Sequence, residues 1–208
     1  AYRHLVDSSL DWGQDLPGLK RWLDQQGLSG QTRTPVYISY FGAGNPGYYG
    51  INAIILPSFA LRITHERDPL TGGVYCISAS MLQSLYLFAR GTWSAYYEEP
   101  YREVLADIER YNRTSSGSEA RLRLVSEKGE GFWKKRFREY SQLRAARLMA
   151  YLRQREPDDQ VGYSILIYRL SDQDIQRALY GPLDELSPGV APGISSLGDA
   201  GKPIQRPQ

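Results

Sequence analysis

Polar side chains suited to binding a sugar are concentrated between residues 7 and 15 of the chain. Carboxylates, amides and hydroxyls exchange hydrogen bonds with sugar hydroxyls, and an indole ring offers an apolar face for stacking. The segment provides all of these groups, in Asp7, Ser8, Ser9, Asp11, Trp12, Gln14 and Asp15. The same carboxylates and hydroxyls also cap helices and satisfy the amides of turns, so a purely structural role stays open.

Two predicted elements hold this polar turn in place. Leu5 and Val6 form a short apolar strand before it. Asp15 occupies the N-cap position of a helix that follows it, and Pro17 lies in the first turn of that helix. The helix is indicated by apolar residues at spacings of three, four and seven, which are Leu16, Leu19, Trp22 and Leu23. Ligands of open α/β sheets bind where a strand passes into a helix, so this turn is the first candidate site.

The predicted strands at residues 36–41 and 74–78 also end in polar residues. Parallel strands end at the same edge of a sheet, so we expect these ends to lie beside the acidic turn. Two tyrosines of the loop after the first of these strands are candidates for stacking on a sugar ring. The candidate ligand-binding residues therefore also include Tyr40, Gly42, Asn45, Tyr48, Tyr49, Ser78 and Ser80.

The order of strands and helices predicts an α/β fold in three layers, with a mostly parallel sheet of about four or five strands. Residues 1–186 form a single domain with a helical insertion at about 92–158, and residues 187–208 form a flexible tail rich in Pro, Gly and Ser. Further expected elements are strands at 61–64 and 161–168, and helices at 80–88, 102–111, 131–155 and 172–179.

The residues needed for most kinds of catalysis are absent or isolated in the sequence. Cys76 is the single cysteine, which excludes an intrachain disulfide and a cysteine-based zinc site. The two histidines, His4 and His65, are far apart, and there is no G-x-S-x-G motif. The spacing of the three aspartates in the acidic turn fits no known ion-binding loop. We therefore predict no catalytic residue, no metal and no cofactor.

A glycine-rich loop supports an alternative function, a free-standing enzyme that binds a small molecule or a nucleotide. Gly42–Gly47 has the G-x-G-x-x-G spacing and follows a predicted strand. The nucleotide motif requires a helix directly after it, but Pro46 and the residues that follow leave room for only a short helical turn. In this alternative the loop acts together with the Asp7–Asp15 turn, where Asp11 and Asp15 are candidates for the two carboxylates of a glycosidase.

Basic residues are concentrated in the second half of the chain. The net charge is only +2, which is too small to indicate a nucleic-acid-binding protein, and we predict no nucleic-acid partner. Residues 119–155, which include the predicted helix 131–155, nevertheless carry eleven Lys or Arg and four Glu. A solvated helix face and a surface that contacts anionic lipid head groups are the two interpretations that fit such a segment.

Four segments share a pattern with a known protein family. They are Leu5–Leu16, Ser39–Gly42 with Asn45–Ile51, Gly73–Ser80 and Val161–Tyr168. Together they resemble the soluble C-terminal domain of some bacterial membrane glycosyltransferases, in the protein O-mannosyltransferase-like, polyprenyl-phosphate-sugar-dependent superfamily. The insertion at 92–158 is longer than this family pattern.

The resemblance implies a non-catalytic accessory domain on the extracytoplasmic, periplasmic face of the membrane. In that superfamily an acidic motif on the first loop between membrane helices carries catalysis, and no such loop is present in these 208 residues. The implied ligand is a glycan, an acceptor or a polyprenyl-phosphate-linked sugar. The first predicted strand begins close to residue 1, so we expect upstream segments. The resemblance implies that these include membrane spans that attach the domain to the membrane surface.

Overall fold

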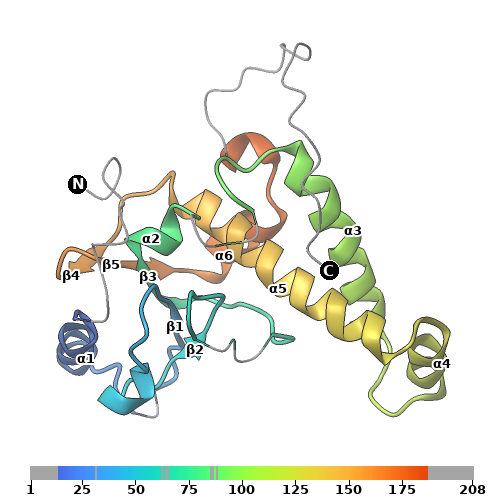
Figure 1. Cartoon of the computed structure of the whole chain (residues 1–208), viewed down its shortest axis with the longest axis horizontal. Coiled ribbons are helices and arrows are strands. Elements are labelled where there is room, and N and C mark those ends of the chain that lie inside the picture. Colours follow the sequence, from blue (N-terminus) through green and yellow to red (C-terminus); the bar gives the residue numbers. More distant parts are fainter. Residues whose placement is uncertain are drawn as a thin grey trace.

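A mixed five-stranded sheet with helices on both faces forms the centre of the molecule (Figure 1). The computed structural model describes residues 14–186, except 31, 62, 64, 65, 85, 86 and 88. The strand order is β2-β1-β3-β5-β4, and β5 alone runs against the other four. The strands are β1 (Val36–Ser39), β2 (Ile54–Ile55), β3 (Gly73–Ser78), β4 (Asp159–Val161) and β5 (Ile165–Leu170). The predicted α/β class is confirmed.

Helix α1 (Leu16–Gln25) covers one face of the sheet. Its four predicted apolar positions are all buried, and they pack on side chains that alternate along the strands, such as Val36, Ile38, Val74 and Cys76. The indole Nε1 of Trp22 donates a 2.6 Å hydrogen bond to Asp159 at the start of β4, which ties the helix to the edge of the sheet. Cys76 is fully buried, and burial raises the pKa of its thiol to about 12.

A second, larger core lies on the opposite face and includes Tyr37, Tyr75, Leu166 and Tyr168 from the strands. Helices α2 (Ala79–Leu82), α3 (Ala95–Arg113), α4 (Glu119–Lys128), α5 (Glu130–Leu152) and α6 (Asp172–Tyr180) contribute to it. The helical hairpin formed by α3 and α5 extends away from the sheet, with α4 at its far end (Figure 1). These two cores on opposite faces give the predicted three layers.

Three expected elements differ from the structure, each for a local reason. The apolar run 161–168 is not one strand: Gly162, with φ +58°, turns the chain so that β4 and β5 pair as an antiparallel hairpin. The helix expected at 80–88 ends at Leu82, because Ser84 adopts φ +57°, a left-handed conformation that a helix cannot continue through. Leu61 and Ile63 are not in a strand, and the edge strand beside β1 is instead β2.

The insertion is helical, as expected, and its first helix is longer than predicted whereas α5 ends three residues earlier than predicted. Helix α3 begins at Ala95, and a further helix, α4, lies between the two predicted helices of the insertion. The predicted strand at Leu5 and Val6, most of the acidic turn and the tail 187–208 lie outside the described residues. Within the described residues, no helix is both long enough and apolar enough to cross a membrane.

Helix α6 begins with a complete capping box, because the Ser171 and Asp174 side chains each accept a hydrogen bond from the other's backbone amide. Arg155 also donates a 2.5 Å hydrogen bond to the Asp174 carboxylate. Burial raises the pKa of Asp174, but the hydrogen bonds from Ser171 and the charge of Arg155 outweigh it and bring the pKa to about 2.

This low pKa predicts an acid-sensitive contribution to folding stability. A carboxylate whose pKa is lower in the folded state stabilises the fold fully above its unfolded pKa of about 4, and this contribution is lost as the pH falls toward 2. We expect Asp174→Asn to lower the urea midpoint near pH 7 and to leave it nearly unchanged near pH 2. Equal destabilisation of the variant at both pH values would contradict the assignment.

Candidate functional site

Two of the three strand ends predicted to share one edge of the sheet, those of β1 and β3, lie together, and the third lies outside the described residues. β1 and β3 are parallel neighbours, and β5 begins where β3 ends, with Ile165 opposite Ser78. Hydrogen bonds join the segments that meet there: the Phe41 amide donates to the Ser78 hydroxyl over 2.9 Å, and the Ala79 amide donates to the Ser164 carbonyl over 2.7 Å. We refer to this region, formed by residues 40–42, 56–59, 78–80 and 162–164 with Asp15, as the strand-end edge.

Asp15 lies at the strand-end edge but does not use its side chain to cap α1. Its carboxylate instead accepts a 2.6 Å hydrogen bond from the Ser164 hydroxyl, in the turn before β5. The contact is tight, since a Cβ atom on Gly162 would lie 2.3 Å from Asp15 Oδ2. This bond leaves the carboxylate, which is only partly buried, with lone pairs that can accept further hydrogen bonds.

The other predicted residues at this edge are mostly occupied by structural contacts. Tyr40 is buried, and its ring lies directly against Gly42, where a Cβ atom would come within 2.7 Å of the tyrosine hydroxyl. The Ser78 hydroxyl accepts the Phe41 amide. Ser80 is different: its hydroxyl is buried and has no hydrogen-bond partner among the residues that the structure describes.

The glycine-rich loop leads into a 3₁₀ turn, η1 (Pro46–Tyr49), rather than a helix. The Asn45 side chain caps this turn by accepting the Gly47 amide over 2.9 Å. Tyr48 is exposed, whereas Tyr49 packs against the core beneath α1. A turn of four residues lacks the aligned amides that hold a pyrophosphate, so the loop does not form the nucleotide-binding motif.

Two exposed aromatic residues at the strand-end edge were not among the predicted site residues. Tyr163, 82% exposed, occupies the β4–β5 turn directly before Ser164, and Phe59, 55% exposed, follows β2 and packs against Phe41. The sequence does not single out Tyr163, because residues 161–168 have the pattern of one continuous strand. The only local sign of a turn is Gly162, directly before Tyr163. No local sequence pattern predicts that Phe59 is exposed, because its exposure depends on where the preceding strand β2 lies.

The described part of this edge offers hydrogen-bonding groups and exposed aromatic rings. Among residues 14–186 as described, no three His, Cys, Asp or Glu side chains come together in a way that could hold a metal ion. The Asp15 carboxylate is hydrogen-bonded to a serine hydroxyl rather than to a second carboxylate. Asp7, Ser8, Ser9, Asp11 and Trp12 lie outside the described residues, and Gln14 is exposed just before α1.

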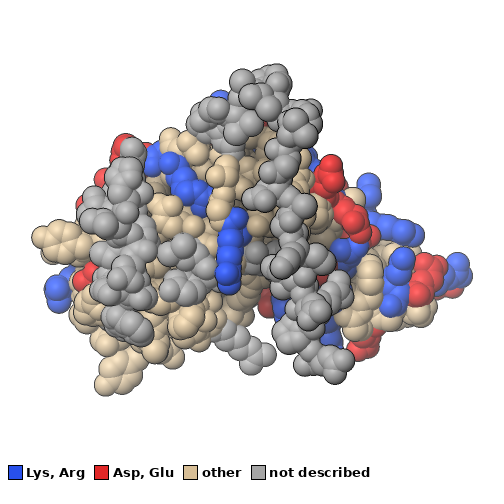
Figure 2. Space-filling model, turned by 45° about the horizontal axis from the view of Figure 1, so that its top comes forward, with Lys and Arg blue, Asp and Glu red and all other residues tan. Residues whose placement is uncertain are grey.

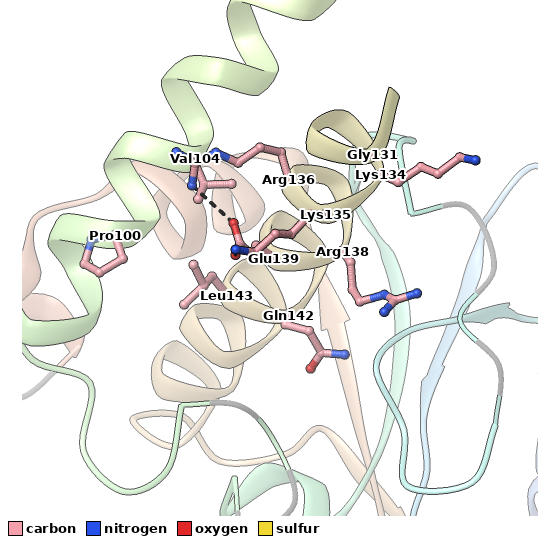
Figure 3. A pocket seen from close by; sticks show the side chains of 10 residues that line it. All are labelled: Pro100, Val104, Gly131, Lys134, Lys135, Arg136, Arg138, Glu139, Gln142 and Leu143. Carbon is pink, nitrogen blue, oxygen red and sulfur yellow. Dashed lines mark hydrogen bonds and ion pairs between the residues drawn. The ribbon is translucent and has the colours of Figure 1, made fainter. Parts of the chain in front are cut away.

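A groove of about 650 Å³ lies on a second surface, over the α3–α5 hairpin (Figure 3). Pro100 and Val104 belong to α3, and the remaining lining residues belong to α5. Lys134 and Arg138 extend from the side of α5 that faces away from α3 (Figure 3). The lining is completed by Gly131, Lys135, Arg136, Glu139, Gln142 and Leu143.

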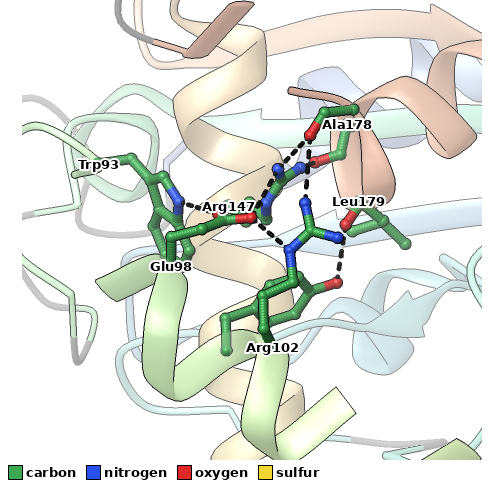
Figure 4. Close-up of polar contacts among 8 residues, drawn as sticks. Trp93, Glu98, Arg102, Arg147, Ala178 and Leu179 are labelled. Carbon is green, nitrogen blue, oxygen red and sulfur yellow. Dashed lines mark hydrogen bonds and ion pairs between the residues drawn. The ribbon is translucent and has the colours of Figure 1, made fainter. Parts of the chain in front are cut away.

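A buried ion pair joins the two helices of the hairpin to α6 (Figure 4). Arg147, with no exposed surface, bonds both carboxylate oxygens of Glu98 over 2.9 and 3.1 Å and also donates to the carbonyls of Ala178 and Gly181. Burial raises the pKa of Glu98, but hydrogen bonds from Arg147, Trp93 and Arg102 outweigh it and hold the pKa below its usual range. The charged groups of this network are all engaged in contacts that hold the helices together.

Comparison with protein-family models, curated proteins and solved structures finds no match to this chain. The predicted resemblance to glycosyltransferase domains therefore rests on the four sequence segments alone.

Proposed function

We propose that this chain is a non-catalytic accessory domain of a membrane glycosyltransferase and that it binds a glycan or acceptor at the strand-end edge. The observation that carries the proposal is the exposed Tyr163 in the β4–β5 turn, directly before Ser164, whose hydroxyl bonds the Asp15 carboxylate. An exposed aromatic face beside a carboxylate and hydroxyls is the combination that sugar binding uses, because the ring stacks on C–H groups while the oxygens bind hydroxyls.

Binding, rather than catalysis, fits the chemistry of the described edge. Hydrolysis of a glycosidic bond requires two carboxyl groups at a defined separation, and Asp15 is the one carboxylate in the described part of the edge. The parent enzyme would supply the reacting groups from its membrane part, and this domain would hold the glycan or acceptor on the periplasmic face.

Titration with sugars tests the proposed site. We expect monosaccharides and a polyprenyl-phosphate-linked sugar to shift the backbone amide NMR signals of residues 162–164, and Tyr163→Ala to weaken the affinity by about three- to tenfold. Tyr96→Ala is the matched control, because Tyr96 is similarly exposed (78%) but lies on α3. The absence of any shift, or an equal loss of affinity in the control, would contradict the proposal.

The gene provides an independent test of the membrane assignment. The proposal requires that the full-length reading frame encode membrane-spanning helices in addition to this domain. A native protein without such spans would exclude the accessory role, although sugar binding at the strand-end edge could still be measured separately.

A further inference from the structure

The helical hairpin carries the positive charge of the molecule. Residues 95–155 contain fourteen Lys or Arg and nine Asp or Glu, a net charge of +5, although the whole chain has a net charge of only +2. The remaining residues are therefore negative overall. Acidic and basic side chains are interspersed at the surface of the hairpin (Figure 2), so what matters is which cations lack a carboxylate partner.

The basic side chains on the two sides of α5 differ in whether they form ion pairs with carboxylates. On the side toward α3, Arg136 forms ion pairs with Glu103, Asp107 and Glu139, and Lys135 lies 3.6 Å from Glu139. On the other side, Lys134 and Arg138 are exposed, one helical turn apart, and have no carboxylate within 4 Å among the described residues. The uncompensated charge is thus concentrated on one side of α5.

A third cation lies near Lys134. Arg67 stacks its guanidinium 4.4 Å above the Phe137 ring and, together with Lys134 and Glu130, lines a smaller hollow beside the groove. Arg67 is also exposed and has no ion pair among the described residues. Lys134 lines both hollows, so the three cations surround a continuous surface.

The groove also offers apolar surface. Pro100, Val104 and Leu143 line it between the two helices, and the aliphatic parts of the long basic side chains add to this surface. Cations next to an apolar groove complement a ligand that has a phosphate attached to hydrocarbon. A bare phosphate would leave the apolar part of the groove unused.

We propose that this face of α5 docks on an anionic membrane surface, with lipid phosphate head groups bound by Lys134, Arg138 and Arg67. Each Lys or Arg near an anionic bilayer strengthens binding by roughly fivefold. The hydrocarbon next to the head groups contacts the apolar part of the groove. This docking is independent of sugar binding, because the strand-end edge is formed by other residues.

Vesicle co-sedimentation of the full chain tests this docking. We expect binding to vesicles of phosphatidylglycerol and phosphatidylcholine, little binding to phosphatidylcholine alone, and weaker binding as salt is raised. The double variant Lys134→Glu with Arg138→Glu is expected to bind the anionic vesicles at least about 30-fold more weakly. The matched control is Arg21→Glu with Arg33→Glu, which changes the net charge equally at exposed positions outside the hairpin.

Several results would overturn the proposal. Equal losses in the two double variants would show a non-specific response to net charge. Binding of octyl phosphate or inorganic phosphate without vesicle binding would assign the groove to a free phosphate ligand instead. A change in oligomeric state between the wild type and the Lys134→Glu, Arg138→Glu variant in size-exclusion chromatography would assign it to a second copy of the chain.

Discussion

Replacing Arg147 with Ala is expected to destabilise the fold by about 3–5 kcal/mol, which is a large part of the stability of a typical domain. The substitution leaves the Glu98 carboxylate in a largely buried position with Trp93 and Arg102 as its remaining partners among the described residues. It also removes the donors to the carbonyls of Ala178 and Gly181, at the end of α6. Urea unfolding followed by circular dichroism measures the loss.

Two comparison variants show how much of this loss of stability comes from burying an unpaired charge and how much from losing the ion pair itself. Arg123→Ala breaks an exposed pair with Glu119 on α4, and it is expected to cost less than about 1 kcal/mol. Arg147→Met combined with Glu98→Gln removes both buried charges, and it is expected to be less destabilised than the sum of the single variants. Strict additivity would show that the two side chains do not interact in the folded protein.

The elements that could be predicted from the sequence are those specified by local patterns. The spacing of Leu16, Leu19 and Leu23 predicts α1 with its buried face, and Ser171 predicts the start of α6. Strands β1 and β3 follow from runs of β-branched and aromatic residues, and the two strand ends meet at one edge because parallel pairing requires it.

The remaining features depend on contacts between distant residues. Nothing local indicates that Arg147 is paired with Glu98, or that Arg136 is neutralised by acids on α3 while Arg138 is not. A count of basic residues in 119–155 treats these arginines as equivalent. Similarly, Asp15 occupies the expected N-cap position, but its side chain bonds Ser164, which is 149 residues away in sequence.

Phe137→Ala is the second substitution expected to have a large effect, with a loss of about 3–5 kcal/mol. The ring is buried in the larger core, with an edge-to-face contact to Tyr111 on α3 at 5.0 Å and the Arg67 guanidinium 4.4 Å from its centre. Phe59→Ala, at an exposed phenylalanine, is the matched control and is expected to cost less than about 1 kcal/mol.

The same variant shows whether the hairpin and the sheet unfold together. The larger core runs without interruption from Tyr75 in β3 to Trp133 in α5, so loosening it at Phe137 should weaken both regions. We expect one unfolding midpoint, lower by about 6–20 °C, for both near-UV and far-UV circular dichroism. Two separate midpoints would show that the hairpin is an independent unit.

Phe137→Leu isolates the contribution of the ring face. Leucine keeps the position apolar but cannot stack under a guanidinium, so the loss is expected to be about 1–2 kcal/mol, between those of the wild type and the alanine variant. Releasing Arg67 from Phe137 should also weaken vesicle binding, because the guanidinium is then no longer held beside Lys134. Vesicle affinity that is unchanged in Phe137→Leu would show that Arg67 takes no part in docking, and would confine the lipid contact to Lys134 and Arg138.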